Sequence, residues 1–205
     1  MTDPAGLWLF ILTSVVIELT PGPNMAWLAV VAASKGRRPG LAAVAGVALG
    51  LLVVGLAAAL GLAAMIQASP ALYQTLRWGG TLWLLYLAWD GWRDADAENT
   101  QTEGWPMARY FRRGLVTNLL NPKAAVFFVA VLPGFVDPTG PVVQETVTLS
   151  LIFVAVATSI HASIVMLAAA ARVLLTDPMR ERLLRRGLSL LLAGIAVWFA
   201  WTTKG

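Results

Sequence analysis

The chain has 205 residues, of which 58% are hydrophobic and only 13% are charged, and it contains no cysteine. Soluble proteins carry about 25% charged residues, and a soluble domain of this size could not bury so much apolar surface. The composition therefore excludes an ordinary soluble domain and indicates a polytopic membrane protein. The absence of cysteine excludes disulfides and thiol chemistry, and the single histidine argues against a histidine-clustered metal centre. The net charge of +4 does not indicate nucleic-acid binding, because the basic residues group in short loops between apolar runs.

The sequence predicts an all-α membrane protein with six transmembrane helices. A helix needs about 20 apolar residues to cross the hydrocarbon core, and the segments that qualify are residues 5–33, 40–66, 70–92, 114–136, 146–171 and 184–203. They form a single transmembrane domain, 1–205, with three-helix halves 1–92 and 113–205 joined by the polar linker 93–112. The N-terminus lacks the basic stretch of a signal peptide, so we expect the first helix to be retained.

The first predicted helix is interrupted near its middle. The interruption consists of Thr20, Pro21, Gly22, Pro23 and Asn24. A proline inside a helix removes a backbone donor and costs about 3 kcal/mol or more, and it disfavours helix at the residue before it. Within a membrane, freed carbonyls must find partners or line a wet cavity. We therefore expect this break to face the protein interior.

The basic residues predict how the helices are oriented. Twelve of the fifteen lysines and arginines fall in the loops after the first, third and fifth helices, on one side of a six-helix arrangement. These residues are Lys35, Arg37, Arg38, Arg93, Arg109, Arg112, Arg113, Arg172, Arg180, Arg182, Arg185 and Arg186. Because basic loops stay in the cytoplasm, we expect both termini to lie outside.

The fourth predicted helix carries a second interruption, Asn121-Pro122-Lys123. Asn121 suits the N-cap of a helix and Pro122 its first position, so this break can start a new half-helix. A half-helix N-terminus presents unpaired N–H groups and a partial positive charge, which suit a carboxylate. Lys123 is tolerable in that first turn if an anion binds there or a carboxylate lies nearby. Asn118 is a further candidate for substrate contact, or for a hydrogen bond to a neighbouring helix.

Broken helices at the first position of two oppositely oriented halves are the layout of an inverted-repeat transporter. An amino-acid zwitterion needs an anion site and a cation site. Half-helix amides with Lys123 can supply the first, whereas Glu18, Thr20 and exposed carbonyls can supply the second. A charge at bilayer depth costs about 2.5–3.5 kcal/mol on insertion scales, so Glu18 is also the best candidate for a coupling proton. The alternative is that Glu18 pairs structurally with Lys123.

Two further features have a structural and a functional interpretation. His161, in the fifth predicted helix, is a candidate proton relay or a polar contact between helices. Gly46 and Gly50 form a small-xxx-small pair that favours close packing, within the subunit or between subunits. No nucleophile elbow, phosphate-binding loop or carboxylate-rich metal motif occurs in the sequence, which disfavours an ATP-driven pump, an enzyme and a cofactor.

Three stretches of the sequence resemble the LysE/RhtB-type family of bacterial amino-acid exporters. They are LTPGPNMAWLAVVAASKGRRPGLAAVAGVALG, RWGGTLWLLYLAWDGWR and RRGLVTNLLNPKAAVFFVAVLPGFV, which start at residues 19, 77 and 112. The resemblance implies an inner-membrane efflux carrier with six helices, driven by the proton motive force and compatible with a homodimer. It places residues 20–24 in the first family signature, and Asn118, Asn121, Pro122 and Lys123 in the second.

The chain departs from the family pattern in the fifth predicted helix. Family members often carry an aspartate there and a tyrosine some residues later, whereas this chain has Ser159-Ile160-His161-Ala162-Ser163 and alanines at 168–171. The departure leaves basic, neutral and apolar substrates open, and it makes His161 a candidate substitute.

The sequence thus predicts a proton-coupled secondary exporter of amino acids or small derivatives, whose partners are the substrate, protons and the lipid bilayer. The alternatives are a carrier for another small solute, such as a metal ion or an organic anion, and a non-transporting scaffold or enzyme. An enzyme would use Glu18 and His161 at its site.

Overall fold

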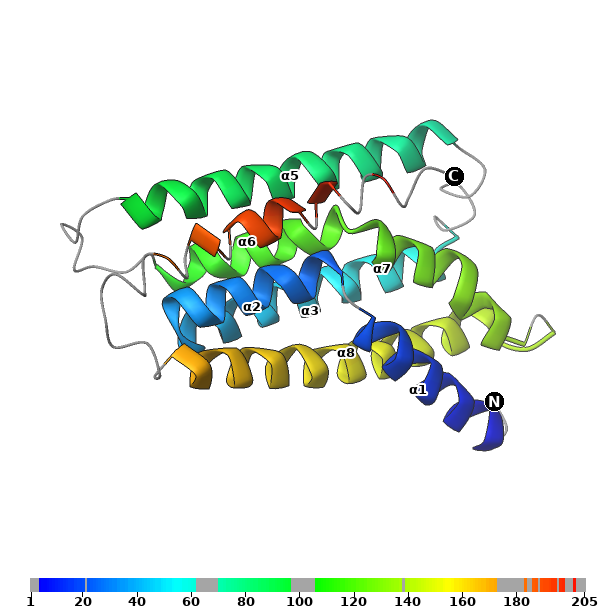
Figure 1. Ribbon diagram of the computed structural model, residues 1–205. Coiled ribbons are helices and arrows are strands. Elements are labelled where there is room, and N and C mark those ends of the chain that lie inside the picture. Colours follow the sequence, from blue (N-terminus) through cyan, green and yellow to red (C-terminus); the bar gives the residue numbers. More distant parts are fainter. Residues whose placement is uncertain are drawn as a thin grey trace.

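In the computed structural model of the chain, the described residues are 4–20, 22–61, 70–96, 106–137, 139–172 and a few positions between 183 and 201. Every regular element among them is helical, and the helices lie side by side in a bundle (Figure 1). The elements are α1 (Pro4–Leu19), α2 (Pro23–Lys35), α3 (Arg37–Ala59), α5 (Pro70–Asp96), α6 (Met107–Leu119), α7 (Pro122–Val126), the π-helix η1 (Phe127–Val131), the 3₁₀-helix η2 (Leu132–Phe135) and α8 (Val142–Arg172). The predicted all-α class is confirmed.

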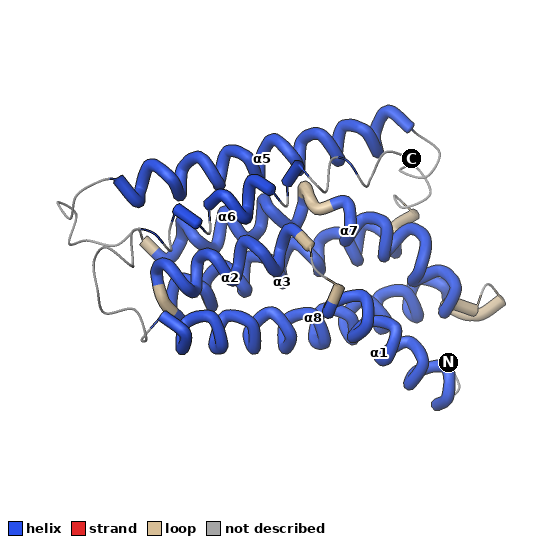
Figure 2. Tube along the Cα trace, viewed as in Figure 1, coloured by secondary structure: helices blue, strands red, loops and turns tan. Residues whose placement is uncertain are grey.

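Two of the apolar segments are broken helices. The axes of α1 and α2 meet at 60°, and those of α6 and the helical segment Lys123–Phe135 meet at 52°. Both breaks fall along the length of the bundle and not at its ends (Figure 2). Bends of this size deflect the chain without reversing it, so each pair is a candidate for one interrupted span. The predicted breaks in the first and fourth helices are thereby confirmed.

The sequence around each break explains where the helices stop and restart. α1 ends at Leu19 because Pro21 disfavours helix at the residue before it. α2 restarts with Pro23 as its first residue, after Gly22 in an extended conformation with φ −164°. α7 restarts in the same way at Pro122, and the side chain of its N-cap residue, Asn121, accepts the backbone N–H of Lys123.

The predicted number of six spans is not confirmed. Among the described residues, two single helices, α3 and Val142–Ala171 of α8, are long and apolar enough to cross a membrane, and each bent pair adds one more candidate. α5 has 27 residues but is not among these candidates. Within the predicted sixth helix, 184–203, the described positions are 186, 187, 189–194, 196, 197 and 201, and all of them are helical.

The helices extend further into the polar region at 93–112 than the composition suggests. Residues 93–96 continue α5, and residues 107–112 form the first part of α6. Polar composition does not prevent helix here, because α6 is amphipathic and buries Tyr110 on its inner face. The predicted start of the fourth helix, at 114, is therefore too late.

One end of the bundle carries most of the described basic side chains. The α2–α3 junction, the end of α5, the start of α6 and the end of α8 all lie at this end (Figure 1). We name it the basic end, after Lys35, Arg37, Arg38, Arg93, Arg109, Arg112 and Arg113. α1, α5 and α8 begin at the opposite end (Figure 1). The described helices therefore alternate in direction as the sequence predicts.

Helices α3 and α6 cross in close contact through glycine. An ideal Cβ built on Gly46 would lie 2.0 Å from the carbonyl oxygen of Phe111, and one on Gly114 would lie 2.2 Å from that of Ala43. Gly50 faces Asn118 of α6 in the same way, at 2.8 Å. Small residues allow helix backbones to approach within a membrane, so this glycine pair packs within the subunit. The crossing fixes the position of the second break relative to the first half of the chain.

We expect the substitution Gly46→Ala to destabilise the protein by about 1–3 kcal/mol, because the added methyl group forces α3 and α6 apart. The measurement is the thermal unfolding midpoint of the purified protein in detergent. Gly6→Ala is the matched control, since nothing lies within 4 Å of a Cβ at Gly6. An unchanged midpoint for Gly46→Ala would contradict the close crossing.

Candidate functional site

The two helix breaks lie against each other. The Nζ atom of Lys123, in the first turn after the second break, donates a hydrogen bond of 2.8 Å to the main-chain carbonyl of Thr20 at the first. A Cβ at Gly22 would lie only 3.3 Å from Cδ of Lys123, so a side chain at position 22 would crowd the lysine. A carbonyl freed where α1 ends is thus satisfied by a cation from the other half of the chain, as the membrane environment requires.

A buried amide pair links the same two regions. Nδ2 of Asn24, in the first turn of α2, donates to Oδ1 of Asn118 on α6 at 2.8 Å. The second polar atom of each side chain, Oδ1 of Asn24 and Nδ2 of Asn118, is buried and has no hydrogen-bond partner within the described part of the chain. Buried polar atoms without partners are costly and rare. The pair therefore has one acceptor atom and one donor atom that can each form a further hydrogen bond.

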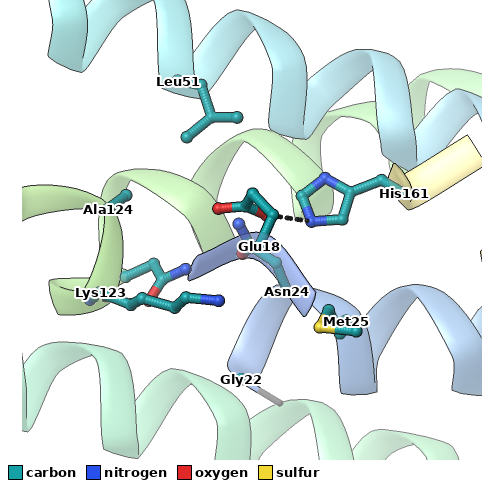
Figure 3. A pocket seen from close by; sticks show the side chains of 9 residues that line it. Glu18, Gly22, Asn24, Met25, Leu51, Lys123, Ala124 and His161 are labelled. Atoms are coloured by element: carbon teal, nitrogen blue, oxygen red, sulfur yellow. Dashed lines mark hydrogen bonds and ion pairs between the residues drawn. The ribbon is translucent and has the colours of Figure 1, made fainter. Parts of the chain in front are cut away.

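Glu18 and His161 form a third polar contact at this level of the bundle. Oε2 of Glu18 lies 3.1 Å from Nε2 of His161, and the two side chains are 8% and 1% exposed (Figure 3). The carboxylate therefore pairs with the histidine of α8, while Lys123 binds the Thr20 carbonyl. Both ring nitrogens of His161 are buried and neither meets hydrogen-bond geometry with a described residue, so the contact with Glu18 is one of distance and charge. This pair can accept or release a proton inside the bundle without contact with lipid.

A small pocket connects these groups (Figure 3). Its lining residues are Glu18, Gly22, Asn24, Met25, Leu51, Asn121, Lys123, Ala124 and His161. The space that it leaves accommodates about one water molecule. In this conformation the pocket is contracted, and a larger ligand would need the surrounding helices to separate.

The N-terminus of α2 opens onto the pocket. Its N-cap residue, Gly22, has no side chain to accept the first N–H groups, and the first intrahelical bond runs from the N–H of Ala26 to the carbonyl of Gly22. Pro23 has no N–H, so the free amides of the first turn are those of Asn24 and Met25, both pocket-lining residues. With Lys123 nearby, this side of the pocket suits an anion.

A cluster of phenylalanines lies further along the bundle than the pocket, on the side away from the basic end, and none of its members is a lining residue. Phe127 of η1 stacks on Phe153 of α8 with ring centroids 3.6 Å apart, and Phe10 of α1 lies 6.1 Å from Phe127. Phe10 and Phe153 each precede a member of the Glu18–His161 pair by two helical turns, about 12 Å. Because α1 and α8 both run toward the basic end, the rings form an apolar layer between the polar pair and the opposite end (Figure 1).

Most of the residues predicted from the sequence meet at this pocket. Glu18, Gly22, Asn24, Asn121, Lys123 and His161 line it directly. Thr20 contributes its carbonyl, and Asn118 lies behind Asn24. Pro23 is buried as the first residue of α2 and is not among the lining residues. Pro21 and the side chain of Pro122 lie outside the described residues.

Among known proteins, a family model matches most of the length of the chain. The model described as LysE type translocator matches residues 15–203, which include both breaks and His161. The chain belongs to the LysE type translocator family. The printed description of this family, a translocator, names a transport protein and not an enzyme. No solved structure matches the chain.

Individual LysE-family relatives align with part of the chain. An uncharacterised membrane protein of Pseudomonas aeruginosa is 36% identical over 138 residues, which cover 64% of each chain. A homoserine/homoserine lactone efflux protein of Salmonella typhimurium is 31% identical over 134 residues, covering 64% of this chain and 65% of the relative. A leucine efflux protein of Salmonella choleraesuis is 30% identical over 138 residues, covering 65% of each. The alignments thus span slightly less than two thirds of these relatives.

Sequence reasoning did not single out the phenylalanine cluster. Two sequence features could have indicated this cluster. One is the pair Phe127-Phe128 after the second break, and the other is the eight-residue spacing from Phe10 to Glu18 and from Phe153 to His161. Such spacing places residues on one helix face, but it does not show which helices meet. Trp83 was not singled out either, and its indole N–H donates to Thr117 of α6.

We expect Asn24→Ala and Asn118→Ala each to cost about 1–3 kcal/mol, because each leaves a buried amide unpaired. The double variant should cost less than the sum, with a coupling energy of about 0.6–1.7 kcal/mol. The measurement is a double-mutant cycle on unfolding in detergent or bicelles. Ser14→Ala with Ser150→Ala is the control cycle, since each buried hydroxyl bonds only within its own helix and the two should be additive. Additive costs at Asn24 and Asn118 would contradict the amide pair.

Proposed function

We propose that this chain is a secondary exporter of amino acids or close derivatives, coupled to proton entry across the bacterial inner membrane. Membership of the LysE family supports transport, and the printed names of two relatives support amino-acid-like substrates. The single observation that carries the proposal is the buried Glu18–His161 pair, which shares one interior pocket with Lys123 and both helix breaks.

The pocket suits an amino-acid zwitterion because it has two chemically different sides. The amides at the start of α2 and the ammonium of Lys123 lie where a substrate carboxylate would bind. The Thr20 carbonyl, which Lys123 occupies in this conformation, and Oδ1 of Asn24 can accept from a substrate ammonium. Binding would then move Lys123 from the carbonyl to the carboxylate, so the substrate replaces a bond that the empty protein already makes.

Proton coupling is assigned to Glu18 and His161. The two groups are almost fully buried and lie 3.1 Å apart, so the protonation of each depends on that of the other. Intramembrane carboxylates and histidines of this kind commonly act in proton relays. Because the pair and the substrate site share one pocket, a change of protonation alters the charge that the substrate meets. Such a shared site is sufficient to make substrate release depend on proton binding.

Transport requires the pocket to open alternately to each side of the membrane. We propose that the halves 1–92 and 113–205, joined through 93–112, rock about the central pocket. The basic end is assigned to the cytoplasm and both termini to the outside by the positive-inside rule. The phenylalanine cluster then lies between the pocket and the outside, and it must separate before substrate can leave.

The function is tested by counterflow of labelled solutes into proteoliposomes, run as a panel at two pH values. The panel includes apolar, neutral and basic amino acids, homoserine, an organic anion and a divalent metal ion. Counterflow of one or more amino acids that is absent from empty liposomes supports the proposal. Counterflow of only the anion or the metal, or of nothing in the panel, would overturn the assignment of substrate class.

We expect Glu18→Gln to reduce transport driven by a pH gradient at least tenfold while counterflow of the same substrate persists, because counterflow needs binding and rocking but no net proton movement. His161→Gln should have the same effect. Glu145→Gln is the matched control, since Glu145 is a buried carboxylate at the opposite end of the bundle. Normal gradient-driven transport by Glu18→Gln would contradict the coupling role, and loss of counterflow as well would place Glu18 in substrate binding.

A further inference from the structure

A second polar cavity lies at the basic end, away from the central pocket. It occupies about 880 Å³, open solvent included, between the C-terminal half of α5 and the start of α6, and it extends from the basic end toward the middle of the bundle. Its lining residues are Trp83, Tyr86, Pro106, Ala108, Arg109, Arg112, Arg113 and Val116. None of them lines the central pocket, so the proposed transport function leaves this cavity without a role.

The charge of this cavity suits an anion. Three of its described lining residues are arginines and none is acidic. Arg113 lines the cavity and is paired with Asp90 at 2.7 Å. Arg112 is exposed, and the side chain of Arg109 is 41% exposed and 4.0 Å from Asp90. Planar guanidinium groups bind phosphate through paired hydrogen bonds.

Aromatic side chains form one wall of the cavity, a feature that the binding of a free ion does not require. The rings of Trp83 and Tyr86 lie 5.4 Å apart, and the guanidinium of Arg113 lies 5.7 Å from the centre of the Tyr86 ring. The indole N–H of Trp83 is bound to Thr117, which fixes the orientation of this ring. Trp83 is the midpoint of α5 and bonds to Thr117, so its ring lies deeper along the bundle than Arg109 and Arg112.

An apolar strip continues from the cavity along the outer face of α5. Leu82, Tyr86 and Trp89 recur at helical spacing on this face and are 62%, 45% and 62% exposed. A phosphate held at the arginines would place the attached chains along this strip. An inorganic phosphate would leave the strip unused.

We propose that the cavity between α5 and α6 binds the phosphate headgroup of an anionic phospholipid, with its acyl chains along α5. Basic pockets between membrane helices on the cytoplasmic side bind such headgroups. Arg109 and Arg112 hold the phosphate, and Trp83 and Tyr86 contact the glycerol region. A lipid in this position would bridge the end of the first half of the chain and the start of the second.

The test is native mass spectrometry of the purified full chain with phosphatidylglycerol or phosphatidylcholine added at matched concentrations. We expect preferential binding of phosphatidylglycerol, weakened roughly thirtyfold in the double variant Arg109→Gln/Arg112→Gln. Arg112→Gln alone should weaken binding roughly fivefold. Because Arg112 is exposed, this single variant tests the site even if the double variant folds poorly.

The matched control is Arg37→Gln/Arg38→Gln, which removes two exposed arginines from the same end of the bundle but outside the cavity. Retained binding in this control, with loss in the cavity variants, supports the site. Equal loss in both double variants would overturn it in favour of general surface charge. Displacement of the lipid by equimolar inorganic phosphate would show a free-anion site. A lipid-independent change of oligomeric state in the cavity variant would show an interface between copies.

Discussion

A helix that breaks inside an apolar environment exposes main-chain carbonyls and amides that water cannot reach, and each must find a partner within the protein. This chain contains two such breaks, and it satisfies them by placing one against the other. The Thr20 carbonyl accepts from Lys123, and Asn24 donates to Asn118. Because the partners come from different halves of the chain, each break is tolerable only while the halves stay together.

This mutual dependence explains the surrounding packing. Glycines at the α3–α6 crossing bring the second break within hydrogen-bond reach of the first. The polar groups collected around the breaks then form the one level of the bundle at which Glu18 and His161 can pair away from lipid. The contact between Lys123 and the Thr20 carbonyl can be exchanged for contacts with a bound solute, since both groups are polar and border the same small space. The same atoms therefore contribute to the stability of the empty protein and to its affinity for substrate.

The sequence was sufficient to predict the features that depend on local chemistry. Proline and glycine at residues 21–23, and proline at 122, specify where helices stop and restart, and the structure agrees. Pairings between distant helices were not predictable in this way. Lys123 was the obvious partner for Glu18 by charge, but the histidine on α8 occupies that place, because the helix face that carries Phe153 and Ala157 toward the core also carries His161. The polar composition of residues 93–112 likewise obscured the amphipathic pattern of the start of α6, so the early start of this helix was not predicted.

Cysteine accessibility tests most directly whether the two breaks meet at an interior, water-accessible pocket. The chain has no native cysteine, so each introduced cysteine is the only reactive thiol. Single cysteines at Met25 and Ala124, which line the pocket, are compared with cysteines at Leu12 and Val16, on the exposed apolar face of α1. With a charged, water-soluble thiol reagent in membranes, we expect labelling at the first two positions, slowed by a transported amino acid, and none at the other two. Labelling of the pocket cysteines only by a lipid-soluble reagent would contradict the account.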